Sequence, residues 1–223
     1  MSNLFKMSFM ALLITGVMAL TASATKADTV TFTTTGVFSG LSVNGSGAGT
    51  STATFGTATN NISIKFTGSN QSILVPPQNG TVNLGVFNTA LNGEGADGSG
   101  ILTLTINQTS PTPGSNSFTG TLSASFVFSG AGPAGGSGIV VFTPASVTIG
   151  AVTYTLSKNG TVALSVPPDD KGTFSELGNS VEATVQVSSV PEPTSMLLLG
   201  SGLIGLAGAA RRKFRSNNQI DKI

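Results

Sequence analysis

Apolar and polar residues alternate one by one along the central part of the chain, and this alternation is the feature that most restricts the fold. It is clearest in residues 102–107, 118–128, 152–156, 162–166 and 181–188. Successive side chains of a β-strand point to opposite faces of a sheet, so a period of two indicates a strand with one buried face. No central segment shows the 3.6-residue period of a helix. The pattern therefore predicts an all-β domain.

Turn signals separate these runs and favour antiparallel strands. Asn-Gly and Asp-Gly pairs adopt the positive φ of tight turns, and we expect turns at Asn79-Gly80, Asn92-Gly93, Asp97-Gly98 and Asn159-Gly160. Lys158-Asn159-Gly160-Thr161 joins two alternating runs and predicts a β-hairpin. The glycine-rich runs Asn44–Gly49 and Gly130–Gly138 are expected as loops. Further strands are expected at Thr29–Phe38, Thr50–Phe55, Ile62–Phe66, Val82–Phe87, Ile139–Phe142 and Val147–Ile149. Many short strands predict an antiparallel β-sandwich or a jelly-roll-like domain.

The residue types exclude several function classes. The chain has no Cys, no His and no Trp, so disulfides, thiol nucleophiles and histidine metal ligands are absent. The segment from Asp28 to Val190 carries seven acidic residues, three lysines and no arginine, a net charge of −4. A weakly acidic segment without arginine lacks the electrostatic footprint of a nucleic-acid-binding protein.

The first 27 residues resemble a secretory signal peptide. Lys6 supplies positive charge, Phe9–Leu20 is a compact apolar run, and small residues follow. We expect cleavage after Ala24 or after Ala27. The alternative is an uncleaved membrane anchor.

Three features follow one another near the other end. In Pro191-Glu192-Pro193, the prolines favour extended backbone geometry at the residues that precede them, and we expect an extended segment. Met196–Ala210 carries no charge and, as a helix, would be about 22 Å long, short of a typical hydrocarbon core of about 30 Å. A basic cluster then predicts a cytoplasmic flank, with residues 216–223 as a cytoplasmic tail. The cluster consists of Arg211, Arg212, Lys213 and Arg215.

A Pro-Glu-Pro motif, a short apolar helix and a basic cluster, in a chain with a signal peptide, resemble the PEP-CTERM sorting signal. The resemblance covers residues 190–215 and leaves residues 28–189 as an extracellular all-β domain. It implies an exosortase partner, a membrane enzyme with a catalytic cysteine in Gram-negative bacteria that make exopolysaccharide. It also implies transient anchoring in the inner membrane and removal of the tail near Pro191–Pro193. The alternative is an ordinary single-pass tail anchor.

Parts of the β domain resemble the choice-of-anchor K type of bacterial surface domain. The similar segments are Thr54–Thr57, Val82–Phe87 and Val152–Leu156. Such domains occur with several anchoring tails and have no established molecular function. The resemblance agrees with a β-sandwich and implies no chemistry.

Few residues are candidates for catalysis or metal binding. A Ser–Lys pair would need Lys65, Lys158 or Lys171. Acidic residues that could form a calcium or glycosidase site are Glu94, Asp97, Asp169 and Asp170. Both acidic segments are better explained as turns, so we expect no catalytic residue, no metal site and no cofactor.

These observations favour a non-catalytic protein of the cell surface or of the exopolysaccharide matrix of a biofilm. Its expected partners are an exosortase-like membrane enzyme, the membrane during sorting, and exopolysaccharide, with no nucleic acid. The alternative is a carbohydrate-binding or calcium-binding module that uses the four acidic residues. A hydrolase is a weaker alternative. A sugar-binding surface usually offers exposed Trp or Tyr, and the chain has only Tyr154.

Overall fold

The computed structural model describes residues 28–42, 44–75, 79–128, 135–176, 178–188 and 199–206. Residues 28–188 belong to one compact unit and residues 199–206 to a second. The expected signal peptide, with both proposed cleavage positions Ala24 and Ala27, lies outside the described residues.

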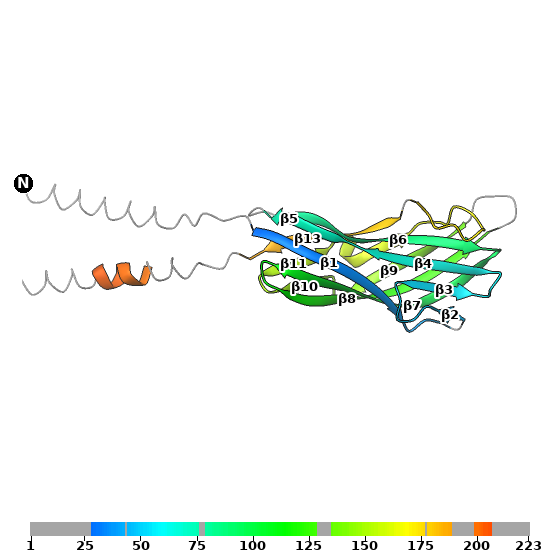
Figure 1. The fold of residues 1–223 in the computed structure, drawn as a ribbon, viewed down its shortest axis with the longest axis horizontal. Helices are drawn as coiled ribbons and strands as arrows, with labels where there is room; N and C mark the ends of the chain where they lie inside the picture. The colour runs from blue at the N-terminus through cyan, green and yellow to red at the C-terminus, as the bar shows by residue number, and fades with distance from the viewer. Residues whose placement is uncertain are drawn as a thin grey trace, which may run out of the picture. The chain divides into compact units, whose positions relative to one another are not determined.

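The β domain consists of two antiparallel sheets (Figure 1). The six-stranded sheet contains, in spatial order, β12 (Thr161–Leu164), β9 (Gly135–Thr143), β8 (Gly114–Val127), β7 (Gly95–Ser110), β1 (Asp28–Ser39) and β5 (Asn70–Val75). The seven-stranded sheet contains β10 (Ser146–Ile149), β11 (Val152–Leu156), β13 (Asn179–Val187), β6 (Gly80–Asn92), β4 (Asn61–Gly68), β3 (Thr52–Gly56) and β2 (Gly45–Ser46). The prediction of an antiparallel all-β domain is confirmed.

The core lies between the two sheets and follows the predicted alternation. In β8, Phe118, Gly120, Leu122, Ala124 and Phe126 are buried, while the residues that alternate with them are exposed. Eight phenylalanines from both sheets are almost completely buried in one hydrophobic cluster. Removal of this apolar surface from water is the main stabilising contribution available to a domain without disulfides.

Glycines allow the ring of Phe66 to lie between the sheets. A Cβ atom built on Gly36 of β1 or on Gly85 of β6 would overlap this ring. Gly85 also has a φ of 144°, which L side chains rarely adopt. The ring then meets Phe87 edge to face, with 5.2 Å between ring centroids. These two positions therefore require glycine for packing.

A hydrogen bond between two buried side chains crosses the core. The hydroxyl of Tyr154 in β11 donates a hydrogen bond of 2.8 Å to Oε1 of Gln108 in β7. The Gln108 amide nitrogen donates to the carbonyl of Thr112 at 2.7 Å. The Tyr154 ring also meets Phe32 edge to face at 5.6 Å. Because Tyr154 and Gln108 are both buried, this contact joins the sheets without leaving either group unpaired.

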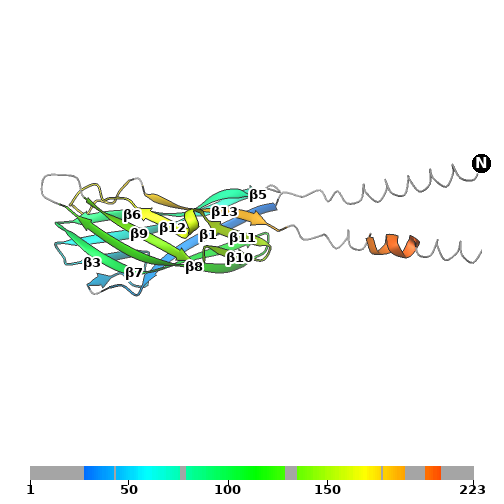
Figure 2. The same cartoon turned by 180° about the vertical axis from the view of Figure 1, so that it is seen from behind.

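The predicted hairpin at Lys158–Thr161 is wrong. β11 pairs with β10 and β13 in the seven-stranded sheet, whereas β12 pairs with β9 in the other sheet. The connection has positive φ at three successive residues, Lys158 (50°), Asn159 (53°) and Gly160 (78°). A two-residue hairpin turn needs at most two such residues. With a third such residue, the segment Ser157–Gly160 forms a short helical turn. The chain then continues into the other sheet (Figure 2).

Two other turn expectations had different outcomes. Gly93 and Glu94 form the turn between β6 and β7, as Asn92-Gly93 predicts. Asp97-Gly98 is not a turn, because both residues lie inside β7. The Phe55 ring occupies the space where a side chain at position 98 would lie, so this glycine serves packing. The expected glycine-rich loops also contain strand, since β2 begins at Gly45 and β9 at Gly135.

β1 begins and β13 ends at the same end of the β domain (Figures 1 and 2). The β6–β7 turn lies at the opposite end, because β7 runs antiparallel to β1 and starts beyond the last residue of β1. The first residue of β1 and the last residue of β13 therefore lie at one end of the domain.

Candidate functional site

The expected sorting residues lie largely outside the described part of the chain. This holds for Pro191, Glu192 and Pro193, and for the basic residues Arg211, Arg212, Lys213 and Arg215. Of the apolar segment 196–210, residues 199–206 are described and form a helix. Its side chains Leu199, Leu203, Ile204 and Leu206 are exposed.

Among the described residues, none of the helices has both the length and the apolar character needed to cross a membrane.

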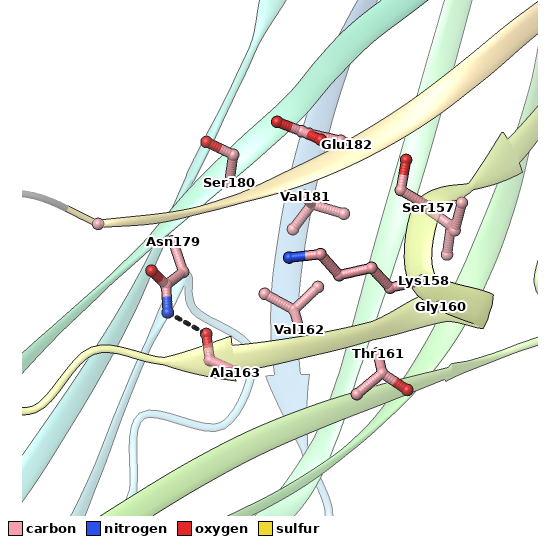
Figure 3. A pocket seen from close by; sticks show the side chains of 12 residues that line it. Ser157, Lys158, Gly160, Thr161, Val162, Ala163, Asn179, Ser180, Val181 and Glu182 are labelled. Atoms are coloured by element: carbon pink, nitrogen blue, oxygen red, sulfur yellow. Dashed lines mark hydrogen bonds between the residues drawn. The ribbon is translucent and has the colours of Figure 1, made fainter.

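A cleft lies between β12 of one sheet and β13 of the other, with a volume of about 410 Å³. It forms because the turn at Lys158–Gly160 takes β12 away from the sheet that contains β13. The side chains of Val162 and Val181 face each other across it, and the amine of Lys158 lies between them (Figure 3). An ammonium group next to aliphatic side chains can bind an acidic or hydroxyl-rich ligand.

The polar groups of the cleft differ in whether they already have partners. The amide of Asn179 donates to the carbonyl of Ala163 and accepts a hydrogen bond from the hydroxyl of Ser165 at 3.2 Å. By contrast, neither the Lys158 amine nor the hydroxyls of Ser157 and Ser180, which also line the cleft, bond to another described residue. Asn179 therefore shapes the cleft, and the other three groups are available to a ligand.

Charge in the cleft is limited to one lysine and one carboxylate. Glu182 lies on β13 and forms no ion pair with Lys158 within the described residues. Across the described ranges, none of the lysine amines hydrogen-bonds a serine hydroxyl, the contact that a Ser–Lys nucleophile requires.

The acidic candidates occupy turns and a strand. The Asp169 carboxylate accepts hydrogen bonds from the backbone N–H groups of Lys171 at 3.1 Å and Thr173 at 3.4 Å. The first of these bonds is the main reason why the pKa of Asp169 is below its ordinary value. Asp170 lies next to the β6–β7 turn, where its carbonyl accepts a hydrogen bond from Gly93 N–H at 2.9 Å. Glu94 is in that turn.

Asp97 points outward from β7. Within the part of the chain that the structure covers, no three acidic side chains come together as a possible cation site. The arrangement therefore gives no positive support to a calcium site at Glu94, Asp97, Asp169 and Asp170.

Tyr154 is not available as a platform for sugar rings. It is completely buried, and this burial raises the pKa of its phenol well above the ordinary value. An exposed aromatic ring is instead found at Phe174, with the Lys65 amine 6.0 Å from the ring centroid. Aromatic stacking therefore has no role in the cleft.

The sequence indicated only part of this cleft. The sequence points to Lys158 only as a partner in a Ser–Lys pair and as part of a turn, and its position beside Asn159-Gly160 is the signal that marks it. Ser157, Ser180 and Glu182 were not identified, because their positions depend on the separation of β12 from β13, which no local pattern encodes.

Comparison with known proteins identifies the segment that follows β13. Residues 189–213 match the PEP-CTERM protein-sorting motif. No curated protein and no solved structure matches the chain. The motif indicates an exported protein that is sorted by an exosortase and is anchored in the membrane during sorting. This chain is therefore a protein that carries the PEP-CTERM protein-sorting motif.

Proposed function

We propose that this protein is a non-catalytic component of the cell surface or of the exopolysaccharide matrix, and that an exosortase removes its tail near Pro191–Pro193. The β domain is the part that is delivered. The proposed source is a Gram-negative bacterium that forms an exopolysaccharide biofilm, and the PEP-CTERM motif supports this part of the proposal.

The observation that carries this proposal is the position of the sorting motif. The last strand of the β domain ends at Val187, and the motif begins at residue 189. Cleavage near Pro191 would therefore release the domain with all of its strands. The absence of His and Cys from the chain supports a non-catalytic role.

The motif can be tested with a matched pair of variants in the native cells. Glu192→Ala removes the single carboxylate of the Pro-Glu-Pro segment, and Asp221→Ala removes a carboxylate outside the motif. We expect the first variant to remain with the membrane fraction, and the second to reach the surface or medium like the unchanged protein. Equal release of both variants would contradict the assigned role of Glu192. Equal release of the unchanged protein from cells without exosortase would contradict the sorting proposal itself.

A second candidate function is saccharide binding in the cleft between β12 and β13. The observation that favours it is the unpaired Lys158 amine between Val162 and Val181, with the hydroxyls of Ser157 and Ser180 nearby. The amine suits a sugar carboxylate, the hydroxyls suit sugar hydroxyls, and the partly exposed side chain of Val162 suits the C–H face of a sugar ring.

Calorimetric titration with tetragalacturonate tests this candidate. We expect heat of binding that Lys158→Gln abolishes and Lys65→Gln leaves unchanged, since Lys65 lies on β4 away from the cleft. The methyl ester of the same oligosaccharide, which lacks the charge, should bind more weakly. Absence of heat with the acid form, or equal binding by the Lys158→Gln variant, would eliminate the cleft as a saccharide site.

A further inference from the structure

The outward face of the six-stranded sheet carries most of the exposed apolar surface of the β domain. Eight large hydrophobic side chains are exposed among the described residues of this domain, and six of them are on this face. The other two, Val166 and Phe174, are in the segment between β12 and β13. The six are Val37, Leu74, Ile101, Val127, Ile139 and Val141, with exposed fractions between 39% and 65%.

The strand register brings four of these side chains into one region of the face, near Thr121. Thr121 of β8 pairs with Ile101 of β7 on one side and with Val141 of β9 on the other. Ile139 lies two residues before Val141 on the same face of β9, and Val37 of β1 lies diagonal to Ile101. Neighbouring side chains on one face of a sheet are close enough to form a continuous surface.

Charge is almost absent from this face. In β1, β5, β7, β8, β9 and β12, the positions that alternate with the core residues are occupied mainly by Thr, Ser and the aliphatic residues named above. Asp97 is the only charged residue among these outward positions of the described strands. The opposite face, on the seven-stranded sheet, carries Lys65 and Glu182. Of the net charge of −4 on residues 28–190, Asp97 contributes −1, so a net charge of −3 lies outside the outward face of the six-stranded sheet.

The size of the face matches that of a stable interface. Its four central strands, at about 4.8 Å spacing and about 40 Å long, cover roughly 750 Å². A standard interface buries about 800 Å² on each partner. Twisted sheets of the same hand pack face to face with interdigitating side chains, as the two sheets of this domain already do.

We infer that the outward face of the six-stranded sheet binds a second copy of this chain and forms a symmetric, face-to-face dimer. Two identical faces that each carry a single charge, Asp97, can approach with little like-charge repulsion, whereas copies that meet through other surfaces bring more acidic groups together. This self-association goes beyond the proposed sorting and does not depend on it. It would link exported domains to one another in the matrix.

A matched pair of substitutions tests the dimer in the exported protein recovered from cells. Thr121→Lys places a charge at the centre of the face, and Thr67→Lys places the same charge at an exposed strand position of the other sheet. Neither threonine side chain hydrogen-bonds another described residue. Sedimentation velocity over concentrations from about 10 µM to about 1 mM measures association, and circular dichroism checks the fold of each variant.

We expect the unchanged protein and the Thr67→Lys variant to sediment as dimers, and the Thr121→Lys variant as a monomer. If the Thr121→Lys variant does not fold, the double variant Ile101→Ser/Val141→Ser is used instead. We expect this double variant to raise the dissociation constant of the dimer at least tenfold. If the copies associate through the tail instead of this face, both lysine variants would associate equally. A monomer at every concentration, or a dimer that survives Thr121→Lys, would overturn the inference. A monomer that instead binds a neutral glucan through Thr121 would replace the second copy with a polysaccharide.

Discussion

Replacing Tyr154 by Phe removes the donor of a hydrogen bond that joins two buried side chains across the core. The ring keeps its place against Phe32, and Oε1 of Gln108 is left buried without a donor. An unsatisfied buried acceptor costs about 1–3 kcal/mol. We therefore expect unfolding to become easier by about 2 kcal/mol, which corresponds to a decrease in Tm of about 4–8 °C for a domain of this size.

The effect of Tyr154→Phe on stability should disappear or reverse when Gln108 is also replaced. In a Gln108→Leu protein the Tyr154 hydroxyl is buried without this acceptor. Removing the hydroxyl therefore removes the free-energy cost of a buried, unpaired polar group. We expect Tyr154→Phe to be neutral or stabilising there, with a coupling of about 0.5–3 kcal/mol between the two positions. Urea unfolding followed by far-ultraviolet circular dichroism measures all four proteins of this cycle. Equal destabilisation by Tyr154→Phe in both backgrounds would refute the assigned hydrogen bond.

The remaining predictions concern pH, packing and one turn. Because burial raises the pKa of Tyr154, the folded state keeps the phenol proton after the unfolded chain has lost it; stability should be unaffected by this group below about pH 10 and should fall by about 1.4 kcal/mol per pH unit above it. Tyr154→Phe should remove this fall in alkaline unfolding curves, and an unchanged slope would contradict the burial argument. Gly36→Ala should destabilise by about 1–3 kcal/mol, because its Cβ overlaps the Phe66 ring; Phe66→Leu in the same chain should recover part of the loss, and no recovery would argue against this contact. Asp169→Ala should speed hydrogen exchange at the Lys171 amide, whose acceptor it removes; an unchanged exchange rate would mean that this bond does not order the turn.

Sequence patterns predicted the parts of the fold that depend on neighbouring residues. The alternation around Phe118–Phe126 correctly indicated which side chains enter the core, because the side-chain direction of a strand is set by the backbone. Asn92-Gly93 correctly indicated a turn, since the φ of Gly93 is positive. The choice-of-anchor K resemblance stays a prediction.

The failures share a physical cause, which is contact between segments distant in sequence. Lys158-Asn159-Gly160 has the composition of a hairpin turn, yet β12 pairs with β9, and only that pairing opens the cleft. In the sequence, Gly98 resembles a glycine of a turn. In the structure, the ring of Phe55 packs against it. Local propensity cannot distinguish a glycine needed for its backbone from one needed for its lack of a side chain.

Intact mass spectrometry of the protein from the native cell surface and medium tests the sorting proposal most directly. We predict a mass that corresponds to a chain whose first residue follows Ala24 or Ala27 and whose last residue is near Pro191–Pro193. Such a chain contains the complete β domain. A mass that extends to Ile223 would contradict the proposal, because the apolar segment and basic cluster would then remain part of the mature protein.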